Sequence, residues 1–135
     1  MKIAVPSADD RGLDSEVGRH FGRVPYYTIV LVEDDAIKEV EVVRNPFSEH
    51  QPGQIPSFLR QKGVGVIIAY GVGWRAREFF NSLGISVITG AYGKVGEVVE
   101  SYIRGSIRTD ESWEEGPEFH RHKMGEGSRK CRDIW

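Results

Sequence analysis

The residue types that bind large anions and metals are concentrated around one histidine. His20 lies in the segment 18–23, together with two arginines, two glycines and a phenylalanine. An imidazole can ligate a transition metal, arginines neutralise an anionic ligand, and glycines let the backbone approach a bulky group. The competing interpretation is an ordinary surface or hydrogen-bonded histidine. The candidate contacts of this first site are Arg19, His20, Phe21, Gly22 and Arg23.

Further metal donors lie elsewhere in the chain. His50 stands in a second irregular segment and can approach the same face as His20. His120, His122 and Cys131 add soft and borderline ligands near the C-terminus. Their spacing fits no finger or cluster pattern, so adventitious metal affinity competes with an evolved site. Because the chain has a single cysteine, an intrachain disulfide and an all-cysteine metal site are excluded.

Two glycine-containing turns lead into expected helices. One is Gly71-Val72-Gly73, and the other runs from Gly90 to Gly93. Backbone N–H groups and the helix dipole converge at such turns, where an anion can sit. Both turns lack the residues of a P-loop or a complete dinucleotide fingerprint, so tight strand-to-helix turns are the competing interpretation. Since neighbouring parallel strands open on one edge of a sheet, the two turns predict one ligand-binding rim, with Gly71 and Gly73 among its contacts.

Catalytic arrangements are scarce in this sequence. Ser7, His20 and Asp14 can be written as a Ser-His-Asp set, but no nucleophile-elbow context surrounds the serine. The expected first strand, 2–6, carries no carboxylate of the kind that holds the ions of two-metal phosphoryl transfer. We therefore expect a protein that is not an enzyme.

The elements that must position these residues follow an α/β pattern. Residues 26–33 and 36–44 are β-branched runs around Asp34-Asp35, which is typical of an antiparallel hairpin. The order β-β-β-α-β-α-β-α predicts a five-stranded mixed sheet with helices packed on it, and a long loop over 7–25. The other expected strands are 2–6, 64–70 and 85–89, and apolar residues recur at helical spacing over 55–59, 76–83 and 95–103.

Length and charge narrow the class of protein. The chain has 135 residues and a formal net charge of −2, which predicts one compact domain and disfavours nucleic-acid binding. It shows neither a signal-peptide pattern nor an apolar stretch long enough for a membrane span, so we expect a cytoplasmic protein. Residues 106–135 have no helical or strand period and are expected to form a charged tail, flexible or docked.

Several segments together resemble the dinitrogenase iron–molybdenum cofactor biosynthesis family, which includes NifX-like proteins and the C-terminal domain of NifB. The resemblance covers residues 1 to about 105, and the His-Phe-Gly-Arg element is its most specific part. The segments that carry it are Met1-Lys2-Ile3-Ala4-Val5-Pro6, Gly12-Leu13-Asp14, His20-Phe21-Gly22-Arg23, Asn45-Pro46 and Val66-Ile67-Ile68-Ala69-Tyr70-Gly71-Val72-Gly73.

The resemblance implies a ribonuclease H-like three-layer α/β/α fold, with sheet order 3-2-1-4-5 and strand 2 antiparallel. It also implies a non-catalytic carrier that transiently binds an iron–sulfur-type cluster or a precursor of the iron–molybdenum cofactor, with His20 matching the cluster-contacting histidine. The implied partners are proteins that donate or accept the cluster, with no nucleic acid and no membrane, and we expect a monomer or weak homo-oligomer. The alternative from the residues alone is a small-anion or nucleotide-binding regulatory module that uses the two glycine turns.

Overall fold

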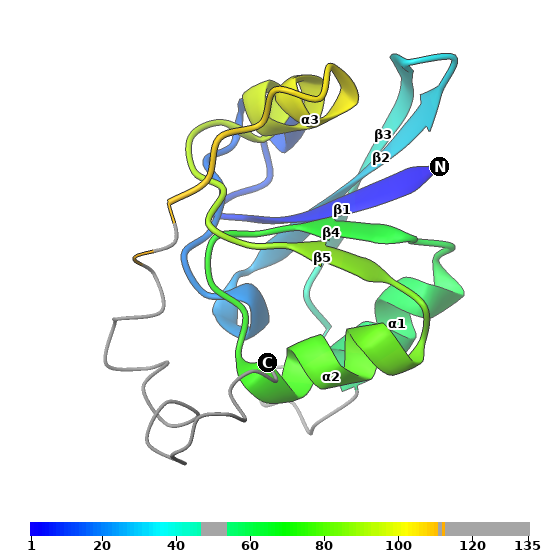
Figure 1. Ribbon diagram of the computed structural model, residues 1–135, viewed down its shortest axis with the longest axis vertical. Coiled ribbons are helices and arrows are strands. Elements are labelled where there is room, and N and C mark those ends of the chain that lie inside the picture. The colour runs from blue at the N-terminus through cyan, green and yellow to red at the C-terminus, as the bar shows by residue number, and fades with distance from the viewer. Residues whose placement is uncertain (47–53, 111, 113–135) are drawn as a thin grey trace.

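The computed structural model describes residues 1–46, 54–110 and 112 (Figure 1). Five strands and three helices follow one another in the predicted order, with two short 3₁₀ turns before the second strand. The elements are β1 (Lys2–Ser7), η1 (Gly12–Asp14), η2 (Phe21–Arg23), β2 (Tyr26–Glu33), β3 (Ala36–Arg44), α1 (Gln54–Gln61), β4 (Val66–Ile68), α2 (Trp74–Ser82), β5 (Ser86–Ile88) and α3 (Val95–Ile103).

The sheet has the strand order β3-β2-β1-β4-β5. β2 runs antiparallel to both β1 and β3, whereas β1, β4 and β5 are parallel. The predicted order and the antiparallel second strand are therefore confirmed. Because β4 and β5 are parallel to β1, the carboxyl ends of these three strands meet at one edge of the sheet, on the left in Figure 1.

The hairpin of β2 and β3 matches its predicted limits. Asp34 and Asp35 connect the strands with φ of 54° and 61°. Left-handed residues at both central positions are typical of the tight turn whose twist suits a β-hairpin. β4 and β5 are shorter than the strands predicted from the apolar runs. An apolar run indicates which residues are buried, but not which of them form hydrogen bonds with a neighbouring strand. Val64 and Ala69 are buried, yet lie just outside β4.

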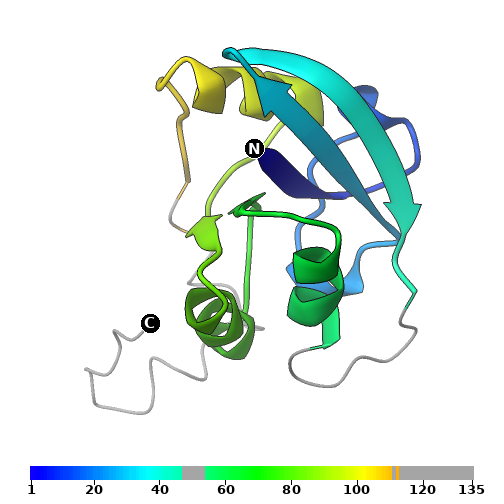
Figure 2. The ribbon, with the colours of Figure 1, turned by 90° about the vertical axis from the view of Figure 1, so that its right-hand side faces the viewer.

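Helices cover both faces of the sheet, which gives three layers (Figure 2). α3 lies on one face, and α1 and α2 lie on the other. Side chains of β1 alternate between the two cores: Ala4 packs in the α1 and α2 core, while Ile3 and Val5 pack in the α3 core. In the described part of the chain no helix is long and apolar enough to cross a membrane.

The segment 7–25, expected as a loop, is tied closely to the sheet and to α3. The Ser7 backbone forms a bridge with Val17, and the Gly18 N–H donates to the Pro6 carbonyl at 2.9 Å. Such pairings join residues without a repeating apolar pattern, so periodicity cannot reveal them. Their effect is to fix the path of the chain on the way to His20.

After α3, residues 106–110 return along the sheet edge toward β5; we call this segment the strap. Ile107 packs against the α3 core, and the Asp110 N–H donates to the Gly90 carbonyl at 2.7 Å. Gly90 has a φ of +86°, and a Cβ there would lie 2.8 Å from the Asp110 carbonyl oxygen. Gly90 is therefore required for this close approach. The domain boundary near 105 stays a prediction, and most of the expected tail lies outside the described residues.

Candidate functional site

The structure joins the two segments that the sequence singled out separately. His20 forms a parallel bridge with Gly71, and the Phe21 N–H donates to the Gly71 carbonyl at 2.9 Å. The turn that leads from β4 into α2 therefore runs beside the histidine, at the carboxyl edge of the parallel strands. Open α/β sheets bind ligands at this edge. We call the segments 18–23 and 70–75 together the rim.

Phe21 anchors the backbone next to His20 in the hydrophobic core. Its side chain is only 3% exposed, and its ring centroid lies 5.2 Å from that of Phe80 and 5.4 Å from that of Tyr27. The Phe80 contact is edge-to-face, a favourable arrangement for two aromatic rings. Phe21 thus points into the core, and its role at the rim is to hold the backbone of its neighbour in place.

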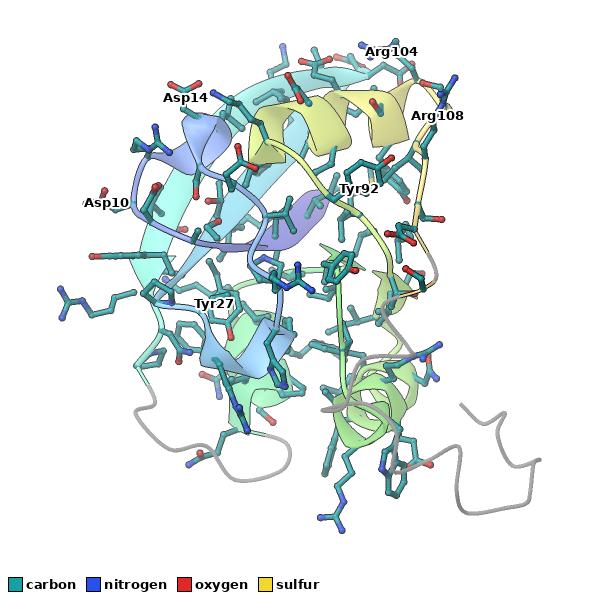
Figure 3. The ribbon with its side chains drawn as sticks, turned by 90° about the vertical axis from the view of Figure 1, so that its left-hand side faces the viewer. Asp10, Asp14, Tyr27, Tyr92, Arg104 and Arg108 are labelled. Carbon is teal, nitrogen blue, oxygen red and sulfur yellow. The ribbon has the colours of Figure 1, made fainter. Side chains whose placement is uncertain are left out.

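Tyr27 of β2 supports the same turn (Figure 3). Its hydroxyl donates to the Phe21 carbonyl at 2.7 Å, and burial raises the pKa of the Tyr27 phenol well above its ordinary value. The hydroxyl therefore keeps its proton, and the hydrogen bond, well into alkaline solution. Sequence patterns missed this residue, because it lies in an ordinary hairpin strand with no sign of its long-range partner.

We expect Tyr27→Phe to lower the free energy of unfolding by about 1–2 kcal/mol at neutral pH, because the buried Phe21 carbonyl loses its donor. The pH dependence should also change. The unfolded state ionises near pH 10 but the folded state only at higher pH, so wild-type stability falls as the pH rises above about 10. Urea unfolding at about pH 8 and about pH 11 checks this, since the variant lacks this phenol. An equally steep alkaline decline in both proteins would contradict the assignment.

Positive charge gathers at the rim. Arg19 and Arg23 are exposed beside His20, and the Arg19 guanidinium lies 5.1 Å from the ring centroid of Tyr70. Across the bridge, α2 begins after Gly73 with Trp74, whose ring centroid lies 5.6 Å from the Arg75 guanidinium. The guanidinium groups of Arg19 and Arg75 therefore each lie near one aromatic ring, a contact that attracts a cation.

The charge at the start of α2 opposes the helix dipole. Arg75 and Arg77 are the second and fourth residues of α2, at the positive end of the helix, where acidic residues are favoured. The first turn of α3, by contrast, contains Glu97. A local conflict of this kind is expected where a bound group compensates for it. Here an anion beside Gly73 would do so, and a Cβ at Gly73 would meet nothing within 4 Å.

At the second glycine turn, backbone groups of the segment 15–17 occupy hydrogen-bonding positions. At the start of α3 the Val95 N–H donates to the Ser15 carbonyl at 2.9 Å, and the Gly93 carbonyl accepts from the Val17 N–H at 2.8 Å. Gly93 also has a φ of +100°, so the turn itself requires glycine. The two turns are therefore not equivalent, and the turn before α2 is the one that adjoins His20.

The other predicted site residues fall in two groups. His20 is partly buried, and its Nδ1 atom is fully buried. Among residues 1–46, 54–110 and 112, no three His, Cys, Asp or Glu side chains could together hold a metal ion. The Ser7 hydroxyl is buried and hydrogen bonded to the Val5 carbonyl and the Thr28 hydroxyl, which is a structural role. Four predicted metal donors lie outside the described residues: His50, His120, His122 and Cys131.

Comparison with known proteins identifies the family of this chain. A model of the family described as dinitrogenase iron-molybdenum cofactor matches residues 1–105. The chain belongs to this family. The match includes both segments of the rim and ends two residues after α3, so the strap and the residues after it lie outside it.

Solved structures similar to this member of the dinitrogenase iron–molybdenum cofactor family share its fold. The crystal structure of PH0822 is 45% identical, covers 84% of this chain and 99% of its own, and has a TM-score of 0.78. A proposed NifB protein of Thermotoga, TM1290, is 29% identical over 80% of this chain and 91% of its own, with a TM-score of 0.66. The apo orange protein of Desulfovibrio gigas is 26% identical over 81% and 92% of the two chains, with a TM-score of 0.67.

Proposed function

We propose that this protein binds and carries an anionic iron–sulfur-type cluster, or a precursor of the iron–molybdenum cofactor, at the rim. The observation that carries the proposal is the bridge between His20 and Gly71. It sets the backbone of His20 beside the turn that leads into α2, and the cation Arg75 is the second residue of that helix. Membership of the dinitrogenase iron–molybdenum cofactor family supports the same cargo.

The donor set favours carriage over permanent retention. His20 supplies one nitrogen ligand, while Arg19, Arg23 and Arg75 supply charge without forming coordination bonds. A cluster held by one imidazole and by electrostatic attraction exchanges readily, because few metal–ligand bonds must break. The role proposed is therefore non-catalytic, and its partners are proteins that donate or accept the cluster.

We expect His20→Ala to lower cluster uptake by at least about tenfold, because it removes the metal–nitrogen bond. Purified protein is incubated with a cluster donor without oxygen, and uptake is followed by absorbance and iron analysis. Arg75→Gln should also weaken uptake. Lys38→Gln should not, because it removes an exposed cation from β3, an outer strand of the sheet. Equal uptake by wild type and His20→Ala would refute the site, and no uptake by either would refute the function.

The second candidate function is binding of a free small anion or nucleotide at the turn before α2. The positive charge of Arg75 and Arg77 at the helix start favours it. Thermal unfolding with inorganic phosphate and with nucleotides distinguishes the two, because a ligand at 100 times its dissociation constant stabilises the native state by about 2.7 kcal/mol. Stabilisation by these anions that His20→Ala leaves intact would favour this candidate over the carrier.

A further inference from the structure

A cavity of about 400 Å³ lies between α3 and the strap. Small-molecule sites in proteins have volumes of about 300–1,000 Å³ and combine an apolar lining with a few polar groups. The lining of this cavity comes from three places in the chain: Tyr92 of the second glycine turn, residues of α3 between 97 and 101, and residues 106–108 of the strap. None of these residues belongs to the rim, so the cavity is a separate site.

Backbone hydrogen bonds hold the strap against α3 and the sheet. At one end, the Ser106 N–H donates to the Ser101 carbonyl at 2.8 Å, and at the other, the Asp110 N–H donates to the Gly90 carbonyl at 2.7 Å. Between these two bonds, Ile107 packs against the α3 core. The cavity therefore lies between two segments whose backbones are both bonded to the folded domain.

Two side chains of opposite charge line the cavity, one from α3 and one from the strap. Glu97 stands in the first turn of α3, and Arg108 belongs to the strap. The Glu97 carboxylate is turned toward the second glycine turn, since a Cβ at Gly93 would lie 3.6 Å from its Oε1 atom. Among the residues that the structure describes, neither Glu97 nor Arg108 takes part in an ion pair. Each charge can therefore pair with a ligand group of opposite sign.

The remaining lining offers apolar and aromatic surface to a ligand. Val98 is buried and Ile107 is half-buried, and both belong to the α3 core. The Tyr92 side chain is 58% exposed, so its ring can contact a bound molecule. Figure 3 shows Tyr92 and Arg108 on the same side of the molecule. An apolar or aromatic group of the ligand would thus leave water beside these three side chains.

We propose that this cavity binds a small zwitterion with an apolar side chain, as a free α-amino acid or a short peptide presents. Its ammonium group pairs with Glu97 and its carboxylate with Arg108, while its side chain contacts Tyr92, Val98 and Ile107. A ligand with a single charge is disfavoured, because the lining residue of like charge repels it. A ligand without charge leaves both lining charges partly desolvated and unpaired.

NMR titration of the isotope-labelled full-length protein tests this proposal with four probes. L-phenylalanine and the dipeptide Phe-Phe carry both charges, whereas hydrocinnamate lacks the ammonium group and phenethylamine lacks the carboxylate. We expect backbone signals of α3 and the strap to shift with a zwitterion, and the tighter of the two zwitterions identifies the source of the ligand. Each singly charged analogue should bind at least about tenfold more weakly than that zwitterion.

Variants that remove one charge separate ligand pairing from a structural role. Glu97→Gln should weaken zwitterion binding by about tenfold or more but strengthen hydrocinnamate binding, because the repulsion of the carboxylate is lost. Arg108→Gln should weaken zwitterion binding similarly and strengthen phenethylamine binding. The matched controls are Glu100→Gln and Arg104→Gln, which remove exposed charges that pair with each other at 3.6 Å and do not line the cavity. Both controls should bind every probe as wild type does.

Three outcomes would overturn the zwitterion site. The first is that neither zwitterion shifts signals of α3 or the strap at millimolar concentration. The second is that the singly charged analogues bind as tightly as the zwitterions. The third is that Glu97→Gln and Arg108→Gln bind the four probes as their matched controls do. The carrier function is tested separately, since His20→Ala should lose cluster uptake and keep zwitterion binding.

Discussion

Gly18→Ala is expected to lower the free energy of unfolding by about 3 kcal/mol, because the methyl group has no room. A Cβ at Gly18 would lie 2.1 Å from Cγ1 of Val24, far inside van der Waals contact. Both residues are buried, and the Gly18 N–H is held by the Pro6 carbonyl, so neither side of the contact can withdraw easily. The clash lies directly between the sheet and the turn that carries His20, so cluster uptake should fall as well.

A compensating variant separates this clash from other effects. Val24→Ala removes Cγ1 and by itself costs about 2 kcal/mol of buried apolar contact. In the double variant, the alanine at position 18 should lower the free energy of unfolding little further. Urea unfolding should therefore show a coupling free energy of about 3 kcal/mol between the two substitutions. Gly73→Ala is the matched glycine control, since φ there is −62° and the added methyl group would meet no atom within 4 Å. Additive losses in the double variant would contradict the steric explanation.

Phe21→Ala should cost about 3–5 kcal/mol, the range for truncating a buried phenylalanine. The ring is 3% exposed and packs against both Phe80 and Tyr27, so its removal leaves a cavity between η2, β2 and α2. Loss of the ring also frees the backbone of His20, so any folded variant should take up cluster poorly. Urea unfolding and the anaerobic uptake assay measure the two effects separately.

The control for this variant is an exposed phenylalanine of α2, the helix that Phe21 packs against. Phe79 of α2 is 39% exposed, so Phe79→Ala should change the free energy of unfolding by roughly 0.5 kcal/mol or less. It should also leave cluster uptake unchanged. A loss at Phe79 as large as that at Phe21 would show that the stability of α2, rather than the anchoring of η2, governs both results.

Sequence patterns identified parts of the candidate site, but not the way they meet. The histidine, its neighbouring arginines and the turn at Gly71 were all predicted as site residues from their types and spacing. Arg75 was missed, although a cation in the first turn of a predicted helix is a readable signal. The placement of these residues is now known, while their role as ligand contacts stays a prediction.

The sequence by itself determined the order of elements, the hairpin limits and the membership of an α/β class. Period-2 and period-3.6 patterns are local, so a single chain displays them before it folds. Resemblance to a known family added the strand order, which the structure confirms.

Only the tertiary structure decided which of two similar glycine turns adjoins His20. Both turns follow parallel strands and precede helices. The Ser15 carbonyl, however, accepts the first N–H of α3, while Gly71 pairs with the histidine. These contacts join residues far apart in the chain, and they form because the two faces of the sheet must be covered at once. A local sequence pattern cannot predict these contacts, because they depend on how segments far apart in the chain pack together at the carboxyl ends of the strands.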